Sequence, residues 1–360
     1  MYYRKKNLVT LKRARAGSIK NNYSIYLDRN EKPNQFPSSI NSQLFKELKK
    51  VQLNFYPEID TFYAKLSKFI EFPKEGIYLT EGVSGGIKSI IETLTLSNKS
   101  NIIFPHPTFA MYDVYAKMFN IEAKHVGYKN YKLDINELEK KINKDTAIVF
   151  IPNPNVPIEG MLSLSELKHL ADLCKKNKSM LAIDEVYFPF SSFSAKSLIH
   201  YYNDTLILQS FSKAFGLAGI RLGYILGTKK NIEYISKMRT GYETNSLSLA
   251  TAEYFIKNYK LIKKYVEYVR EGLDFLKIEL DKIKIEHNGG INGNYLFINL
   301  KSKKISQEIT SRLKKENIYV RANWPKPFNK GILVSGGPKK IMKIFFICFL
   351  KHYKTITKHK

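Results

Sequence analysis

The feature that most constrains the fold is an alternation of short apolar runs with helix-like segments between residues 74 and 230. The runs are almost continuously apolar, which is typical of strands buried on both faces of a parallel sheet. We expect strands at Ile77–Thr80, Asn101–Phe104, Ala147–Pro152, Met180–Ile183, Thr205–Gln209 and Leu222–Leu226. We expect helices at Ile87–Leu94, Phe109–Phe119, Ile135–Lys141 and Ser163–Asn177, the last opened by the capping box Ser163-Leu-Ser-Glu166. The pattern predicts the α/β class, with a mostly parallel central sheet and helices on both of its faces.

The pattern changes after about residue 245. Apolar residues from Ala252 to Val269 recur at helical spacing, which predicts one connecting helix. Beyond it we expect strands at Tyr295–Leu300 and Ile332–Ser335 and helices at Ile305–Glu316 and Lys340–His352. A chain of 360 residues is long enough for more than one domain, at roughly 100–200 residues each. We therefore predict an arm at 1–28 that belongs to the small domain, a large domain at 29–250, and a small α+β domain at 251–360.

The chain is strongly basic, with 59 Lys and Arg against 32 Asp and Glu, a net charge of +27. The basic residues are scattered, which favours a solvated basic surface over a nucleic-acid partner. The two cysteines, Cys174 and Cys348, are far apart, and we expect no metal site. The longest apolar stretch, Ile344–Leu350, is far shorter than the roughly 20 residues that span a bilayer. The N-terminus has no apolar signal-peptide region, so we expect a cytoplasmic protein without a membrane span.

The segment from Ser210 to Arg221 carries the clearest chemical signal. Lys213 lies between small hydroxyl residues and glycines, with Arg221 eight positions on, which suits a lysine that binds a cofactor aldehyde beside a phosphate. Asp184 ends an apolar strand, where a carboxylate can pair with a protonated ring nitrogen, and Tyr187 can reach a phenolic oxygen. A cofactor-binding lysine and an acid for the pyridinium nitrogen predict a pyridoxal 5'-phosphate site.

Other residues fit parts of the same site. Gly82, Val83 and Ser84 follow a strand and open a helix, a pattern typical of anion binding. Further phosphate donors would be Ser210, Ser212 and Arg221. Phe109 could stack on the cofactor ring or be a core aromatic, and the Asn155 amide could donate to the ring oxygen. Arg321 ends an apolar run, so it faces an anionic substrate or is simply solvated.

These motifs, in their order along the chain, resemble the fold-type I pyridoxal-phosphate aminotransferases of class I/II, in the histidinol-phosphate aminotransferase branch. The resemblance rests on Leu27–Glu31, Asn54–Glu58, Gly82–Gly86, Pro107–Tyr112, Asn153–Pro157, Asp184–Tyr187 and Ser210–Arg221. It implies that Lys213 bonds the cofactor and moves the substrate proton, while Asp184 and Tyr187 hold its ring. It also implies that Tyr56 reaches the cofactor phosphate of a neighbouring subunit in a homodimer with shared active sites.

The chain departs from the family at three places. Phe109 stands where the family usually has tyrosine. Val156 stands where a second asparagine is usual, and Ile158-Glu-Gly160 replaces a Thr-Gly pair. In Gly331–Gly336, Ile332 falls where the family has the arginine that binds the amino acid carboxylate, while Arg321 aligns with its other substrate-anion arginine.

The third departure bears on the substrate. Loss of a charged partner weakens binding of a carboxylate by about 1.5–3 kcal/mol. Either another cation replaces the arginine, or one substrate carries no α-carboxylate. We therefore predict transfer of an amino group from a glutamate-like donor to a small phosphorylated ketone that lacks an α-carboxylate, with its phosphate on Arg321.

Alternatives remain open at this stage. The same motifs fit a decarboxylase of a phosphorylated amino acid of the phosphoserine or phosphothreonine type. A histidinol-phosphate aminotransferase proper is less favoured, because of the missing arginine. A nucleic-acid-binding protein that kept the fold is less favoured still, because the 28-residue arm is too short for a helix-turn-helix segment.

Overall fold

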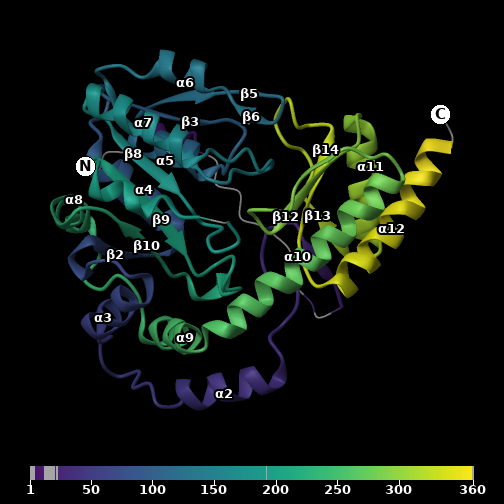
Figure 1. The fold of residues 1–360 in the computed structure, drawn as a ribbon, viewed down its shortest axis with the longest axis horizontal. Helices are drawn as coiled ribbons and strands as arrows, with labels where there is room; N and C mark the ends of the chain where they lie inside the picture. The colour runs from purple at the N-terminus through teal and green to yellow at the C-terminus, as the bar shows by residue number, and fades with distance from the viewer. Residues whose placement is uncertain (1–4, 12–20, 22, 192, 359–360) are drawn as a thin grey trace.

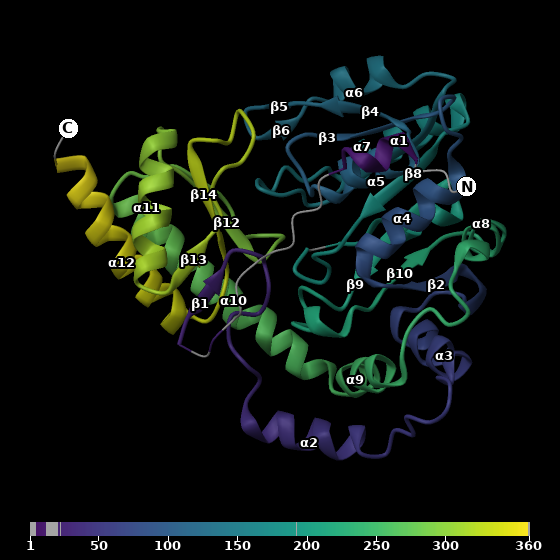
Figure 2. The ribbon, with the colours of Figure 1, turned by 180° about the vertical axis from the view of Figure 1, so that it is seen from behind.

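The computed structural model describes residues 5–11, 21, 23–191 and 193–358, so the predicted arm lies partly outside the described residues. Figure 1 shows a larger part built on a long sheet and a smaller part into which α10, Tyr259–Lys282, extends. The same two parts are seen from behind in Figure 2. This arrangement agrees with the predicted α/β fold, and the predicted domain boundaries remain predictions.

The large sheet has seven strands in the order β2-β10-β9-β8-β7-β3-β4. Their bounds are Ile77–Thr80, Gly223–Leu226, Thr205–Ser210, Met180–Asp184, Thr146–Pro152, Asn101–Pro105 and Glu122–Val126. The five strands from β9 to β4 are parallel, whereas β10 is antiparallel to both neighbours. The sequence did not predict β4, because this edge strand is largely polar and only Val126 is buried.

Helices cover both faces of this sheet, because its side chains alternate between two cores. Val149 and Ile151 of β7 belong to one core, and Ile148 and Phe150 to the other. The first core is covered by α3, α7 and α9, at Ile59–Ile70, Leu164–Asn177 and Ser246–Lys257. The second is covered by α4, α5 and α8, at Gly82–Leu94, Met111–Phe119 and Lys229–Ile235. The predicted capping box at Ser163 is present at the start of α7.

Two further helices and a short hairpin complete the larger part. The helices are α2 and α6, at Ser38–Leu48 and Ile135–Lys141. The hairpin joins β5 and β6, at Tyr128–Lys129 and Lys132–Leu133.

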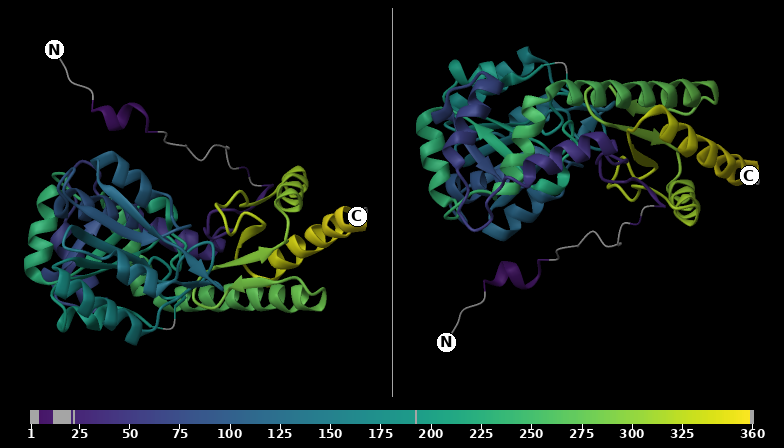
Figure 3. Two further views of the ribbon diagram at one scale, coloured as in Figure 1. Left: turned by 90° about the horizontal axis from the view of Figure 1, so that it is seen from above. Right: turned by 90° about the horizontal axis from the view of Figure 1, so that it is seen from below.

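The smaller part contains a three-stranded antiparallel sheet, β11-β12-β14, at His287–Gly289, Tyr295–Asn299 and Gly331–Ser335. Strand β1, Ile25–Leu27, pairs in parallel with β13, Ile318–Val320, so the end of the predicted arm joins this part. Helices α10, α11 (Lys303–Lys315) and α12 (Lys339–Lys358) pack with these strands around a separate core. Figure 3 shows α10 running from the larger part into the smaller one.

The predicted single connecting helix is wrong. Asn258 leaves the helical conformation, at φ −107° and ψ 38°, and separates α9 from α10. Apolar residues continue on both sides of the break, so their spacing does not reveal it. In the described part of the chain, no helix is both long enough and apolar enough to cross a membrane.

Candidate active site

The carboxyl ends of the parallel strands meet at a cavity of about 600 Å³. Pro152, Asp184 and Ser210 end β7, β8 and β9 and all line it. Ligands of open α/β sheets bind at this edge, because the strand-to-helix loops gather there. The structure brings most of the predicted residues to this cavity, namely Val83, Ser84, Phe109, Asn155, Asp184, Tyr187, Ser210, Ser212, Lys213, Arg221 and Arg321.

Lys213 and Asp184 lie at the centre of the site. The Lys213 amine donates to the Arg29 carbonyl oxygen at 2.8 Å. Asp184 is fully buried, and its carboxylate accepts from the Tyr112 hydroxyl at 2.7 Å and from the Val186 amide at 3.0 Å. Burial raises the pKa of Asp184 to about 6, although both hydrogen bonds and the Lys213 charge act to lower it. A ring cation beside this carboxylate would compensate the desolvation, so the site fits a pyridinium nitrogen.

The sequence interpretation assigned no role to Tyr112. Tyr112 lies on α5 and Phe109 precedes this helix, and their rings pack edge-on with centroids 6.4 Å apart. The Tyr112 ring stacks on Phe104 at 5.3 Å between centroids. Its place in the motif Pro107–Tyr112 is the signal that could have indicated this donor to Asp184.

Tyr187 is held by a buried hydrogen-bond network that links the two parts of the chain. Its hydroxyl accepts from the Asn30 side-chain amide at 2.8 Å. The Asn30 backbone N–H donates to the Ser335 hydroxyl at 2.7 Å, and the Asn294 amide donates to the Asn30 carbonyl at 3.0 Å. Asn30 lines the cavity and was not predicted as a site residue, although it lies in the motif Leu27–Glu31.

The predicted phosphate-binding residues gather at the start of α4. The Arg221 guanidinium donates to the Glu81 carbonyl at 3.0 Å and lies 3.3 Å from the Ser84 hydroxyl. Gly82 has φ +66°, a left-handed conformation that favours glycine, and it lets the Arg221 guanidinium approach the backbone closely. Ser210 and Ser212 are buried and 2.9 Å apart, oxygen to oxygen. Helix N-terminal amides, two hydroxyls and one guanidinium suit a phosphate dianion.

Phe109 and Asn155 also line the cavity. Phe109 is 39% exposed, so its ring is available to a ligand and is not a core aromatic. Asn155 is buried, and its amide already donates to the Pro107 carbonyl and to the Tyr128 hydroxyl. Its contact with the cofactor ring oxygen stays a prediction.

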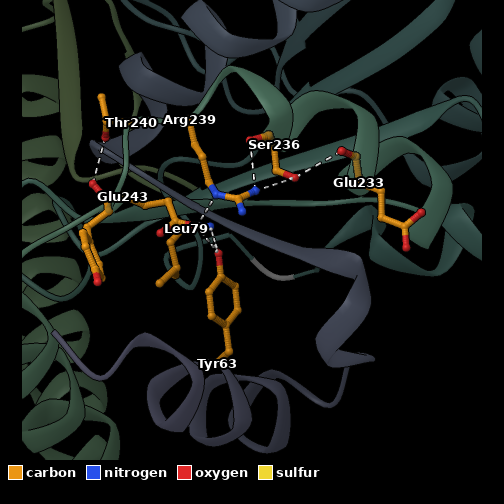
Figure 4. Close-up of polar contacts among 8 residues, drawn as sticks. Tyr63, Leu79, Glu233, Ser236, Arg239, Thr240 and Glu243 are labelled. Atoms are coloured by element: carbon orange, nitrogen blue, oxygen red, sulfur yellow. Dashed lines mark hydrogen bonds and ion pairs between the residues drawn. The ribbon is translucent and has the colours of Figure 1, made fainter. Parts of the chain in front are cut away.

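Tyr56 does not line the cavity of its own chain. It is 75% exposed and stacks on Tyr242, with ring centroids 4.4 Å apart. The segment before Tyr242 is held by polar contacts drawn in Figure 4, where Arg239 lies between Ser236 and Glu243. Exposure of the ring leaves it available to a second chain.

The structure corrects the predicted position of the missing arginine. Ile332 is fully buried in the core beneath α10 and α12, so its side chain points away from the cavity. Its neighbour Leu333 lines the cavity and pairs with Arg321 through two backbone hydrogen bonds, of 3.0 and 2.7 Å. Because side chains alternate along a strand, the position facing a substrate is Leu333. The side chain that this strand turns toward the cavity is therefore aliphatic.

Three arginines are among the described residues that line the cavity, Arg29, Arg221 and Arg321. Arg221 lies at the phosphate end, and Arg29 pairs with Asp28 at 3.5 Å. The Arg321 guanidinium stacks on Trp324, 3.9 Å from the ring centroid. Desolvation lowers the pKa of Arg321, although its side chain is accessible from the cavity. It is therefore well placed to receive a second anion.

The fold and this site define a pyridoxal-phosphate enzyme of fold type I. Residues 23–329 match the family described as aminotransferase class I and II, so the chain belongs to that family. It is a transferase whose cofactor is pyridoxal 5'-phosphate.

Similar proteins indicate the branch of the family to which the chain is related. The chain is 30% identical over 287 residues to a histidinol-phosphate aminotransferase of Pyrococcus furiosus, covering 79% of this chain and 81% of that protein. It is also 30% identical over 313 residues to one of Ruminiclostridium cellulolyticum, covering 83% and 84%. The fold resembles the histidinol-phosphate aminotransferase from Clostridium acetobutylicum, with a TM-score of 0.82, 22% identity, and coverage of 92% and 99%. The predicted family, fold and cofactor are thereby confirmed.

Proposed function

We propose that this aminotransferase moves an amino group from a glutamate-like amino acid to a small phosphorylated ketone that has no α-carboxylate. The product would be a phosphorylated amine of the kind that the relatives' name denotes, histidinol phosphate. The observation that carries the proposal is Leu333 beside Arg321, because these two neighbours offer the substrate one guanidinium and one aliphatic side chain. A phosphate can bind Arg321, whereas an α-carboxylate at Leu333 would lose its partner. The amino acid donor also carries an α-carboxylate, so in this proposal another cation of the cavity, Arg29, would bind it.

The roles of the chain's own residues follow from the geometry. Bound cofactor supplies an electron sink for the bond that breaks at the substrate α-carbon. In the proposal, Lys213 removes and returns the proton at that carbon. Asp184, in its dry environment, keeps the ring nitrogen protonated, and Tyr187 donates to the ring oxygen. Gly82, Val83, Ser84, Ser210, Ser212 and Arg221 hold the phosphate, and Phe109 stacks on the ring. Asn155 donates to the ring oxygen once its amide gives up the hydrogen bond to Pro107 or to Tyr128.

We further propose a homodimer with shared sites. Tyr56 is exposed and does not line the cavity of its own chain, yet it lies in the motif Asn54–Glu58. A second copy would bring this hydroxyl to the phosphate end of the neighbouring cavity. Mixing a Tyr56→Phe chain with a Lys213→Ala chain tests sharing. Mixed dimers should contain one site with both residues intact and should recover activity that neither parent has. If the mixture recovers no activity, the proposal of a shared site is contradicted.

A half-reaction assay tests the substrate. The holoenzyme is mixed with histidinol phosphate or with histidinol, and loss of cofactor absorbance near 410–430 nm is followed, roughly where the lysine-bound cofactor absorbs. The phosphorylated amine should react with a kcat/KM about 10- to 150-fold higher, since a charged hydrogen bond contributes about 1.5–3 kcal/mol.

The Arg321→Gln variant should abolish most of that preference while leaving the cofactor spectrum intact. Equal kcat/KM for the two amines in the parent enzyme would refute the phosphate assignment. O-phosphothreonine serves as the decarboxylase control. Release of carbon dioxide from it, without formation of a 2-oxo acid, would overturn the aminotransferase proposal in favour of the decarboxylase.

A further inference from the structure

Two histidines and an aspartate from different elements meet outside the active-site cavity. His106 follows β3, Asp113 lies in the first turn of α5, and His125 belongs to β4. The His125 Nε2 atom lies 2.9 Å from one Asp113 carboxylate oxygen, and the His106 Nδ1 atom lies 3.9 Å from the other. The ligand atoms of all three residues lie within 4.8 Å of one another.

We propose that His106, Asp113 and His125 form a binding site for a divalent transition-metal ion of the zinc type. Zinc binds imidazole nitrogen and carboxylate oxygen at about 2.0–2.2 Å in a tetrahedron, which separates its ligand atoms by about 3.3 Å. The 2.9 and 3.9 Å distances end on the two different carboxylate oxygens of Asp113, and the ligand atoms of the three residues lie within 4.8 Å of one another. The three side chains are therefore close enough for rotation about their side-chain bonds to bring them to ligand geometry.

The donor atoms select the class of ion. Two imidazoles and one carboxylate suit zinc, cobalt, nickel or copper, whereas magnesium and calcium prefer sites made of oxygen alone. The three side chains are between 29% and 41% exposed, so an ion can enter and keep a water molecule as a further ligand.

The backbone around the cluster is already ordered. His125 pairs with Phe104 across β3 and β4, and the His106 amide donates to the Val126 carbonyl at 2.9 Å. The His125 ring packs edge-on against Phe104, with centroids 5.0 Å apart. Preorganised ligands lose less conformational freedom on binding, which favours affinity. The net charge of +27 opposes cation binding only over the screening distance of about 8 Å.

The site lies next to residues that face the cofactor. His106 precedes Phe109 by three residues, and Asp113 directly follows Tyr112, the donor to Asp184. None of the three proposed ligands is among the residues that line the cavity. A bound ion would thus link the start of α5 to β3 and β4. The site would position these elements and would not take part in catalysis.

A cobalt titration of chelator-treated holoenzyme tests the proposal. We expect one Co²⁺ per chain, visible ligand-field bands that zinc removes, and a higher Tm with zinc. Replacement of one ligand, as in His106→Gln or His125→Gln, should weaken binding at least 10-fold, since even loss of an outer-shell partner typically costs about 10- to 100-fold. The lysine-bound cofactor absorbance of each variant reports whether it is folded, and Asp113→Asn provides a third variant.

His169→Gln is the matched control. His169 lies 2.7 Å from Glu139 and forms another partly exposed histidine–carboxylate pair. This variant should bind cobalt as the parent enzyme does. The proposal is overturned if the parent binds no stoichiometric cobalt, or if folded variants of His106, His125 and Asp113 bind it as tightly as the His169 variant.

Discussion

The Tyr112→Phe substitution tests how the protein sets the pKa of the Asp184 carboxyl group. The phenol hydroxyl donates to this fully buried carboxylate at 2.7 Å, and the substitution removes that donor with little change in ring volume. A hydrogen bond to a charged group contributes about 1.5–3 kcal/mol. At 1.36 kcal/mol per unit, its loss should raise the pKa of Asp184 by about one to two units, from about 6 toward 7 or 8.

The direction of the pH effect follows from linkage. The pKa of Asp184 is raised above its ordinary value of 3.8, so the native protein binds this proton more tightly than the unfolded chain does. The resulting stability is fully present below pH 3.8 and is lost as the pH rises through about 6. In the variant, this stability should be lost only as the pH rises through about 7–8.

Urea unfolding of the cofactor-free protein at pH 5 and pH 8 measures this difference. The variant should be destabilised more at pH 8 than at pH 5, by about 1.4–2.7 kcal/mol. Tyr265→Phe is the control, because in the described part of the chain the buried Tyr265 hydroxyl has no hydrogen-bond partner. It should be nearly neutral at both pH values. A destabilisation by Tyr112→Phe that is the same at pH 5 and pH 8 would refute the reasoning.

Three further substitutions have defined expected outcomes. Arg221→Gln should raise the Kd for pyridoxal 5'-phosphate about 10- to 100-fold, measured by absorbance titration, because the guanidinium lies at the phosphate end. Leu333→Arg should raise the kcat/KM for amino acids relative to histidinol phosphate by about 10-fold or more, and an unchanged ratio would contradict the assignment of this position. Glu159→Gln should lower the free energy of unfolding by about 1–3 kcal/mol in urea, because its buried carboxylate accepts from the amides of Ile291 and Gly293.

Local patterns predicted the large part of the fold well. Apolar strands such as Met180–Ile183 were recognisable because both faces are buried, and Ser163 marked the start of α7 through its capping box. Strand β4 escaped prediction because it lies at the sheet edge and its side chains are mostly polar. The break at Asn258 escaped because a change of backbone conformation leaves the apolar spacing intact.

The site was predictable where a motif lies within one segment, as from Ser210 to Arg221. It was not predictable where segments distant in sequence meet, as in the contacts of Tyr112 with Asp184 and of Asn30 with Tyr187. The run Gly331–Gly337 has two adjacent glycines at its end, so the sequence alone permits two registers one residue apart. A shift of one residue exchanges the two faces of a strand, so the prediction fell on Ile332, whereas Leu333 is the residue that faces the cavity.

The most direct test is to locate the cofactor on the chain. Protein loaded with pyridoxal 5'-phosphate is reduced with borohydride, digested, and mapped by peptide mass. We predict one cofactor-modified peptide, with the added mass on Lys213. An unmodified Lys213, or modification spread over other lysines of this basic chain, would contradict the assignment of the active site.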